Sequence, residues 1–191
     1  MASKKKKSPP KQPAPAKINP STISMLRVDT ERRSNPAING EVGIRRSIKF
    51  RFAIVAARFN DFITKRLVNG AISEFARHGI TEKDLTIVWV PGVFEIPLTA
   101  LKLAQKKNVD AVLCLGAVIK GETLHFDLVA RESARGIMQV SLTTGKPVIF
   151  EVLSTYTVDQ AYKRSEAGGK NKGKDAVLAA LDMTGLLRLL K

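Results

Sequence analysis

The chain has 191 residues, which fits one domain with a terminal extension and is long enough to bury a substantial core. Hydrophobic residues make up 44% of it, yet no apolar run approaches the roughly 20 residues that a transmembrane helix needs. We therefore expect a soluble protein and assign it to the cytoplasm.

Positive charge is concentrated at the N-terminus. The whole chain has a formal net charge of +15, and residues 1–49 alone hold 12 Lys and Arg against 3 Asp and Glu. Residues 1–20 combine four consecutive lysines with five prolines and have little to bury, which predicts a disordered arm over residues 1–40. Such an arm either binds nucleic acid or another polyanion or acts as a solubilising tail. The folded domain is expected over residues 41–191.

Four continuous apolar segments follow the arm. We predict strands over residues 49–57, 85–90, 111–115 and 148–153, because an unbroken apolar run is typical of a strand covered on both faces. Regular structure is therefore expected to begin near Lys49.

The first two predicted helices have clear terminal signals. Asn60 or Asp61 can cap the first, and Gly79 suits the left-handed position that follows a helix. Pro97 is expected as the first residue of the second helix, which reaches about residue 107.

Three further helices are predicted in the second half of the chain. One begins near His125 and stops at Gly145, and Thr157 with Gln160 forms a capping box for another that ends near residue 167. The last spans about residues 174–190. Its larger apolar side chains are expected to point inward, namely Val177, Leu178, Leu181, Met183, Leu186 and Leu187.

Strands that alternate with helices indicate parallel pairing through right-handed crossovers. The predicted fold class is α/β, a three-layer α/β/α sandwich around a four-stranded parallel sheet, to which an N-terminal strand could add a fifth.

Polar and aromatic side chains follow each strand, at the edge of the sheet where the carboxyl ends of parallel strands meet. Loops at this edge are predicted over residues 58–61, 91–95, 117–125 and 154–157. His125 follows a glycine turn there, and an imidazole that titrates near neutrality can move protons. The helix that starts at this point offers N–H groups to an anion.

Two aromatic residues lie in these loops. Phe59 and Phe94 could each stack on a planar heterocycle, or they could fold back over the sheet as ordinary loop aromatics. Glu95 is a lone acid beside Phe94 and suits hydrogen bonds from hydroxyl groups.

Arg164, Lys170 and Lys172 flank the glycine-lysine loop GGKNKG and either bind a phosphate or remain solvated. The loop lacks the spacing of a Walker phosphate loop, and no G-x-G-x-x-G follows the first strand, so no nucleotide cofactor is expected. A metal site is not expected, because no other ligand stands at suitable spacing from His125. Cys114 is interpreted as a buried hydrophobe, and His78 as a charge at a helix end.

The segments that contain these residues occur together, and in the same order, in a known enzyme family. They are RFNDFIT (58–64), RHGI (77–80), WVPGVFEIP (89–97), LGAVIKGETLHFD (115–127), GKPVIFEVL (145–153) and Arg164 followed by NKG (171–173). On these motifs, which cover about residues 50–188, the chain resembles the 6,7-dimethyl-8-ribityllumazine synthases, which catalyse the penultimate step of riboflavin synthesis.

The resemblance implies condensation of 5-amino-6-(D-ribitylamino)uracil with 3,4-dihydroxy-2-butanone 4-phosphate to 6,7-dimethyl-8-ribityllumazine, with release of phosphate and water and no cofactor. It implies that His125 carries protons and that Arg164 binds the phosphate together with the backbone of Glu122 and Thr123. The implied ribitylaminouracil site comprises Phe59, Val93, Phe94, Glu95, Ala117, Val118, Ile119 and, from a neighbouring subunit, Phe150. Asn60 and Lys172 are implied as supporting residues.

The resemblance also implies partners. A homopentamer is expected, which in many members builds a shell of sixty subunits with sites at subunit interfaces, and association with riboflavin synthase is implied as well. Ser165, Glu166 and Lys170 depart from the family pattern beside Arg164. The alternative is a non-catalytic flavin- or lumazine-binding shell protein whose arm binds a polyanion.

Overall fold

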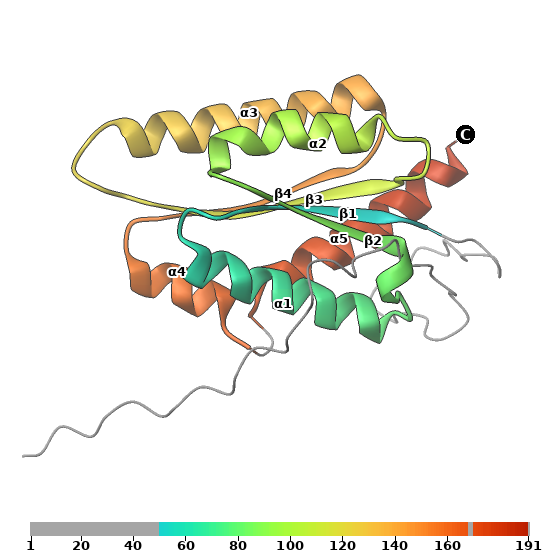
Figure 1. The fold of residues 1–191 in the computed structure, drawn as a ribbon, viewed down its shortest axis with the longest axis horizontal. Coiled ribbons are helices and arrows are strands. Elements are labelled where there is room, and N and C mark those ends of the chain that lie inside the picture. The colour runs from blue at the N-terminus through green and yellow to red at the C-terminus, as the bar shows by residue number, and fades with distance from the viewer. Residues whose placement is uncertain (1–49, 168–169, 191) are drawn as a thin grey trace, which may run out of the picture.

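A computed structural model describes residues 50–167 and 170–190, which form three layers (Figure 1). Its sheet has the order β2-β1-β3-β4, and each neighbouring pair is parallel. The strands are β1 (Phe52–Ala57), β2 (Leu85–Val90), β3 (Ala111–Ile119) and β4 (Val148–Thr155). The predicted α/β/α sandwich is therefore confirmed. The possible N-terminal strand and the arm over residues 1–40 lie outside the described residues.

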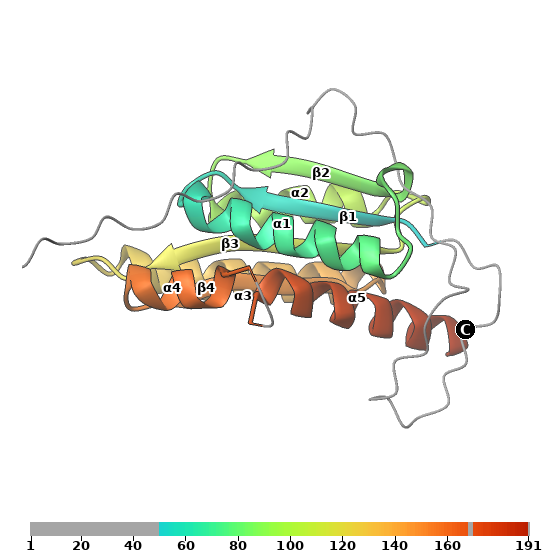
Figure 2. The ribbon, with the colours of Figure 1, turned by 90° about the horizontal axis from the view of Figure 1, so that it is seen from below.

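Helices cover both faces of this sheet (Figure 1). One face is covered by α1 (Asp61–Arg77), α4 (Val158–Ser165) and α5 (Lys172–Leu189), and the other by α2 (Ile96–Ala104) and α3 (His125–Thr144). Two short 3₁₀ turns, η2 (Glu82–Asp84) and η3 (Val93–Glu95), precede β2 and α2. Figure 2 shows α1 and α5 side by side along the sheet. In the part of the chain that is described, no helix has the length and apolar character to cross a membrane.

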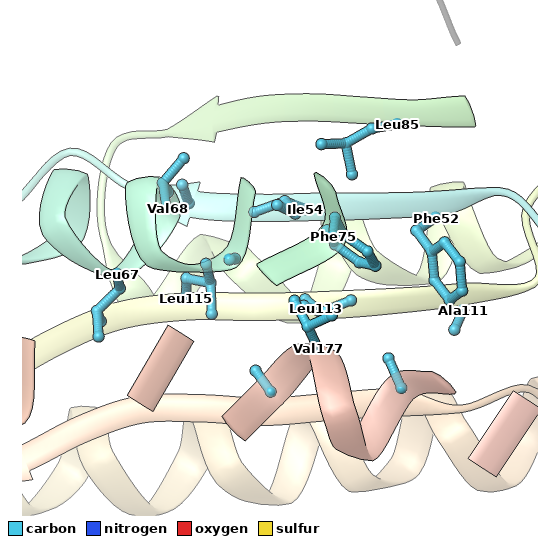
Figure 3. Close-up of a cluster of buried hydrophobic side chains, with 14 of the residues drawn as sticks. Phe52, Ile54, Leu67, Val68, Phe75, Leu85, Ala111, Leu113, Leu115 and Val177 are labelled. Atoms are coloured by element: carbon cyan, nitrogen blue, oxygen red, sulfur yellow. The ribbon is translucent and has the colours of Figure 1, made fainter. Parts of the chain in front are cut away.

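Both faces of the central strand β1 are buried. Phe52 and Ile54 point into the core beneath α1 and α5, whereas Val55 packs beneath α2 and α3. Phe52 lies beside Phe75 of α1 (Figure 3). The centroids of the two rings are 4.9 Å apart. Full burial of each such side chain contributes about 1.5–3 kcal/mol, so the core fixes the position of β1 and of the loop that follows it.

Two strands are longer than the sequence predicts. Strand β3 continues to Ile119, which pairs with Thr155 at the end of β4, so the predicted loops over residues 117–125 and 154–157 begin later. Gly116, which follows the predicted strand over residues 111–115, lies within β3, and a Cβ at Gly116 would come within 2.8 Å of Cγ2 of Val93. At the other end, β1 begins at Phe52, three residues after the predicted start.

Helix ends follow the predicted signals with small shifts. Gly79 and Gly145 adopt the left-handed conformation, with φ of 76° and 62°. Pro97 is the second residue of α2, not the first, and α2 ends at Ala104. Thr157 accepts the N–H of Gln160 at 3.2 Å, as expected of a cap, but the Gln160 side chain accepts from Tyr156 instead of completing the box.

The predicted inward face of α5 is largely wrong. Met183 and Leu186 are exposed, Leu178, Leu181 and Leu187 are partly buried, and only Val177 is fully buried. The buried face consists of small residues and Val177: Gly173, Ala176, Val177, Ala180, Thr184 and Gly185. These residues allow α5 to lie close to α1, since a Cβ on Gly173 would overlap the carbonyl oxygen of Leu67. The close contact with α1 therefore decides which face of α5 is buried, and the size of the hydrophobic side chains does not.

Candidate functional site

The carboxyl ends of β1, β2 and β3 bring the first group of candidate residues to one edge of the sheet, which we call the rim. The N–H groups of Arg58 and Phe59 donate to the carbonyls of Val90 and Pro91 at 2.9 and 3.0 Å. Pairing of these two segments therefore continues beyond β1 and β2. Phe59 is held by its backbone while its ring stays 72% exposed.

Asn60 ties the rim together. Its Nδ2 donates to the carbonyl of Ala117 on β3 at 2.9 Å, and its backbone is left-handed, with φ 59°. Asn60 occupies the N-cap position of α1, as one of the two predicted alternatives, but its side chain makes no capping bond. The side-chain amide bonds to Ala117 instead, and the backbone carbonyl of Asn60 accepts the N–H groups of Ile63 and Thr64. Asparagine tolerates the left-handed region better than most residues, which suits it to this position.

The turn η3 gives the rim an aromatic ring and a carboxylate. Phe94 is 59% exposed, and Glu95 is exposed with its Oε2 accepting the N–H of Gly92 at 2.9 Å. Val93 differs from the expectation, since its side chain is only 4% exposed and packs into the core against Gly116. At this turn the surface therefore consists mainly of Phe94, Glu95 and backbone.

The end of β3 and the start of α3 complete the rim. Ala117 is buried, and Val118 and Ile119 are half-buried at the end of the strand. Thr123 accepts the N–H of His125 through Oγ1 at 3.4 Å, and His125 is the first residue of α3. Glu122, Thr123 and His125 are all exposed. An imidazole at a helix N-terminus is accessible to a ligand, and the helix end favours an anion.

A second group of candidates lines a shallow basin between α4 and α5. The residues of this basin are Lys163, Arg164, Lys170, Lys172 and Asp175. Lys172 Nζ lies 2.8 Å from Asp175 Oδ2, and this hydrogen bond raises the pKa of the lysine. Arg164 Nη1 donates to the carbonyl of Gln160 in its own helix at 3.1 Å. Four cations and one carboxylate line the basin, and Lys163 is also paired with Asp159 at 2.7 Å, so the lining keeps a positive charge that is suited to an anion.

The helices that carry the basin residues are held together by Asn171, for which the sequence patterns predict no role. Its side chain is 2% exposed, and Nδ2 donates to the carbonyls of Arg66 on α1 and Ser165 on α4 at 3.1 and 2.7 Å. Oδ1 accepts the N–H of Gly173 at 2.9 Å and caps α5. One buried amide thus joins three helices and sets where Lys172 begins α5. Local sequence features such as prolines and glycines could not reveal this role of Asn171, because its hydrogen-bond partners include a residue from a distant segment of the chain.

Glu151 on β4 is a second residue that sequence reasoning missed. Burial raises its pKa to about 7, Lys172 acts in the opposite direction and Asp175 reinforces the rise. The available signal was a single acid inside the apolar run VIFEVL. Its neighbour Phe150 is 40% exposed on β4.

The structure therefore gathers most site residues in two groups. Phe59, Asn60, Phe94, Glu95 and His125 belong to the rim, whereas Arg164 and Lys172 belong to the basin. Phe150 lies in neither group, because side chains alternate along β4 and Phe150 shares the face of Val148 and Val152, which α2 and α3 cover. The order β2-β1-β3-β4 makes β4 an edge strand and separates it from β1 by β3. Across residues 50–167 and 170–190, no cluster of three or more His, Cys, Asp or Glu could hold a metal ion.

Comparison with protein-family models identifies the family of the chain. The model described as 6,7-dimethyl-8-ribityllumazine synthase matches residues 49–188. This span includes the whole sheet, the rim and the basin, and so it confirms the resemblance that the motifs indicate. The enzyme of this family is a transferase of riboflavin biosynthesis. The chain belongs to the 6,7-dimethyl-8-ribityllumazine synthase family.

Proposed function

We propose that the protein condenses 5-amino-6-(D-ribitylamino)uracil with 3,4-dihydroxy-2-butanone 4-phosphate to form 6,7-dimethyl-8-ribityllumazine, with release of phosphate and water. The rim is the observation that supports this proposal most directly. It combines exposed aromatic rings, a carboxylate and an imidazole at the carboxyl ends of parallel strands, where ligands bind in open α/β sheets.

The rim has groups suited to the ribitylaminouracil. The exposed ring of Phe59 offers a face on which the pyrimidine can stack, and Phe94 adds apolar surface nearby in the fold. One oxygen of Glu95 is engaged by Gly92, which leaves its other oxygen to accept hydrogen bonds from ribityl hydroxyls. We assign the backbone of Ala117, Val118 and Ile119 to the ring edge and the chain.

His125 is proposed as the proton carrier. The amine attacks the ketone and water leaves to form an imine, then phosphate leaves and ring closure with loss of a second water yields the product. Each step moves a proton, and one imidazole can act in turn as base and acid. His125 is exposed at the first turn of α3, so it is accessible to bound reactants. Holding the two reactants together contributes much of the acceleration.

The phosphate is assigned to two sets of groups. Backbone N–H groups of Glu122 and Thr123 precede α3, and Arg164 with Lys172 supplies positive charge from the basin.

Members of this family are oligomeric. Since the rim belongs to β1–β3 and the basin lies beside β4, we propose that the rim of one subunit meets Phe150 and the basin of its neighbour. A homopentamer, and a shell of sixty as the larger form, would supply such contacts, and riboflavin synthase is retained as a proposed partner.

The proposal is tested by mixing the protein with both reactants and following lumazine absorbance together with phosphate release. Wild-type protein is expected to form product. His125→Ala should slow turnover, and Arg164→Ala should raise KM for the butanone phosphate. Arg135→Ala, which removes an exposed arginine paired with Glu132, serves as the matched control.

Absence of product from the wild type would overturn the proposal. If the protein then bound a lumazine or a flavin tightly, the result would favour a non-catalytic binding protein with the same fold.

A further inference from the structure

Glu151 occupies an unusual position for an acid. Of the residues in the four described strands, only Glu151 carries a charge. Side chains alternate along a strand, so Glu151 shares the face of Ile149 and Leu153, which pack into the cluster that contains Ala176 and Val177 of α5. Glu151 is therefore half-buried on the face of β4 that α5 covers, close enough to Lys172 and Asp175 to interact with their charges.

The surroundings of Glu151 are strongly charged. From α5, Lys172 attracts the carboxylate and Asp175 repels it, while these two are themselves paired at 2.8 Å. Lys163 and Arg164 of α4, with Lys170, complete the charges of the basin on this side. The neighbouring strand β3 contributes the apolar Leu115 opposite Glu151. Lys172 is thus shared between two carboxylates and the basin.

We propose that Glu151 is a positioning residue that couples anion binding in the basin to proton uptake: when an anion binds at Arg164 and Lys172, a larger fraction of the Glu151 carboxylates becomes protonated from solvent. The proposal rests on the function proposed above, in which this anion is the phosphate of the butanone phosphate. Protonation removes one of the two negative charges that compete for Lys172, and so its ammonium becomes available to the ligand.

The direction of the coupling follows from electrostatics. A second negative charge beside a carboxylate disfavours its ionised form, so a bound anion promotes protonation of Glu151. By linkage, protonation of Glu151 must strengthen anion binding to the same extent. Because burial already raises the pKa of Glu151 to about 7, this exchange takes place near neutral pH, where an ordinary exposed glutamate would stay ionised.

The test measures sulfate binding to the full-length assembled protein by titration calorimetry. Sulfate keeps its double charge between about pH 6 and pH 8.5, so any pH dependence comes from the protein. Two buffers with different ionisation enthalpies report the number of protons taken up. Glu151→Gln removes the titrating group and preserves its size. Glu166→Gln makes the same charge change at an exposed residue near Lys163 and is the control.

For the wild type we expect proton uptake on binding and an affinity that falls about tenfold across this range, the equivalent of a one-unit rise in pKa on binding. Glu151→Gln should bind as the wild type does at low pH, with neither uptake nor the pH dependence. Glu166→Gln should keep both.

The outcomes separate this inference from the proposed function. If Glu151→Gln keeps the wild-type proton uptake, the coupling is overturned while the phosphate site stands. If Arg164→Ala binds sulfate as tightly as the wild type, the proposed phosphate contact fails. If the wild type binds no sulfate, the coupling is overturned, and product formation in the assay above still decides the proposed function by itself.

Discussion

The rim and the basin are held in place by different means. In the rim, Phe59 and Asn60 continue from a buried strand, and backbone hydrogen bonds at 2.9 and 3.0 Å extend the pairing of β1 and β2 up to Phe59. In the basin, long cationic side chains project from α4, from α5 and from Lys170 before α5, and the ends of the two helices meet at the buried amide of Asn171. The position of the rim thus depends on the whole sheet, whereas the basin depends on a few contacts. Single substitutions should therefore disturb the rim and the basin separately.

Gly173→Ala should have the largest effect and should act on the basin side. Its Cβ would overlap the Leu67 carbonyl, so α5 must move away from α1. We expect a loss of about 4 kcal/mol in the free energy of unfolding, measured by denaturant titration at fixed protein concentration. Gly121→Ala is the matched control, because a Cβ there meets nothing within 4 Å and should change stability by less than about 0.5 kcal/mol. Equal stability of the two variants would refute the close contact between α1 and α5.

Asn171→Ala should have the second largest effect on stability. It leaves the carbonyls of Arg66 and Ser165 and the N–H of Gly173 without the partner they now share. Because buried polar groups that lose their partners are costly, we expect a loss of about 3 kcal/mol. Sulfate affinity should fall with it, while binding of a ribitylaminouracil analogue to the rim stays near the wild-type value. Gln139→Ala, an amide on the exposed side of α3, is the control. If Asn171→Ala weakened the binding of sulfate and of the ribitylaminouracil analogue to the same extent, the rim and the basin would not be independent.

Asn60 tests the rim in the same way. Asn60→Ala removes the hydrogen bond to Ala117 and forces a left-handed backbone on alanine, so we expect a loss of about 2 kcal/mol. Asn60→Gly removes only the hydrogen bond and should cost about 1 kcal/mol. Thermal unfolding compares the two. If Asn60→Ala and Asn60→Gly lose the same amount of stability, the left-handed backbone conformation at residue 60 does not contribute to the effect.

The smallest expected effect concerns the pH dependence of stability. Burial raises the pKa of Glu151 from its ordinary value of 4.5 to about 7, so the folded protein holds this proton more tightly than the unfolded chain. Wild-type stability should therefore fall as pH rises through this window, and Glu151→Gln should lack that loss. The carboxylate is half-buried and partly screened, so we expect a difference of about 1 kcal/mol. Stability curves of the two proteins that run parallel with pH would contradict it.

Sequence patterns were sufficient for the centres of the strands and the order of the layers. The run from Phe52 to Ala57 is apolar because both of its faces are covered, and that pattern is visible without any partner. The end of β3 was not visible, because Gly116 resembles a turn residue until Val93 is known to occupy the space beside it.

The same limit applies to the site. His125, Phe59 and Glu95 could be proposed from their places after strands, which are local features. Asn171 could not, since its partner Arg66 lies 105 positions earlier. Met183 and Leu186 were expected inside because helical periodicity ranks residues by hydrophobicity, whereas α5 turns its small residues toward α1. Long-range partners, not local propensity, decide these cases.

The central place of β1 has a consequence for biosynthesis. Arg51 and Asp110, which are bonded just before β1 and β3 begin, are 59 residues apart in the chain. A ribosome that adds about 5–20 residues per second needs roughly 3–12 s to bridge this gap. During that interval one edge of β1 is open to strands of other nascent chains. We therefore expect the β1–α1–β2 segment to be the part that most requires a chaperone, and the basin, which needs α5, to mature after the rim.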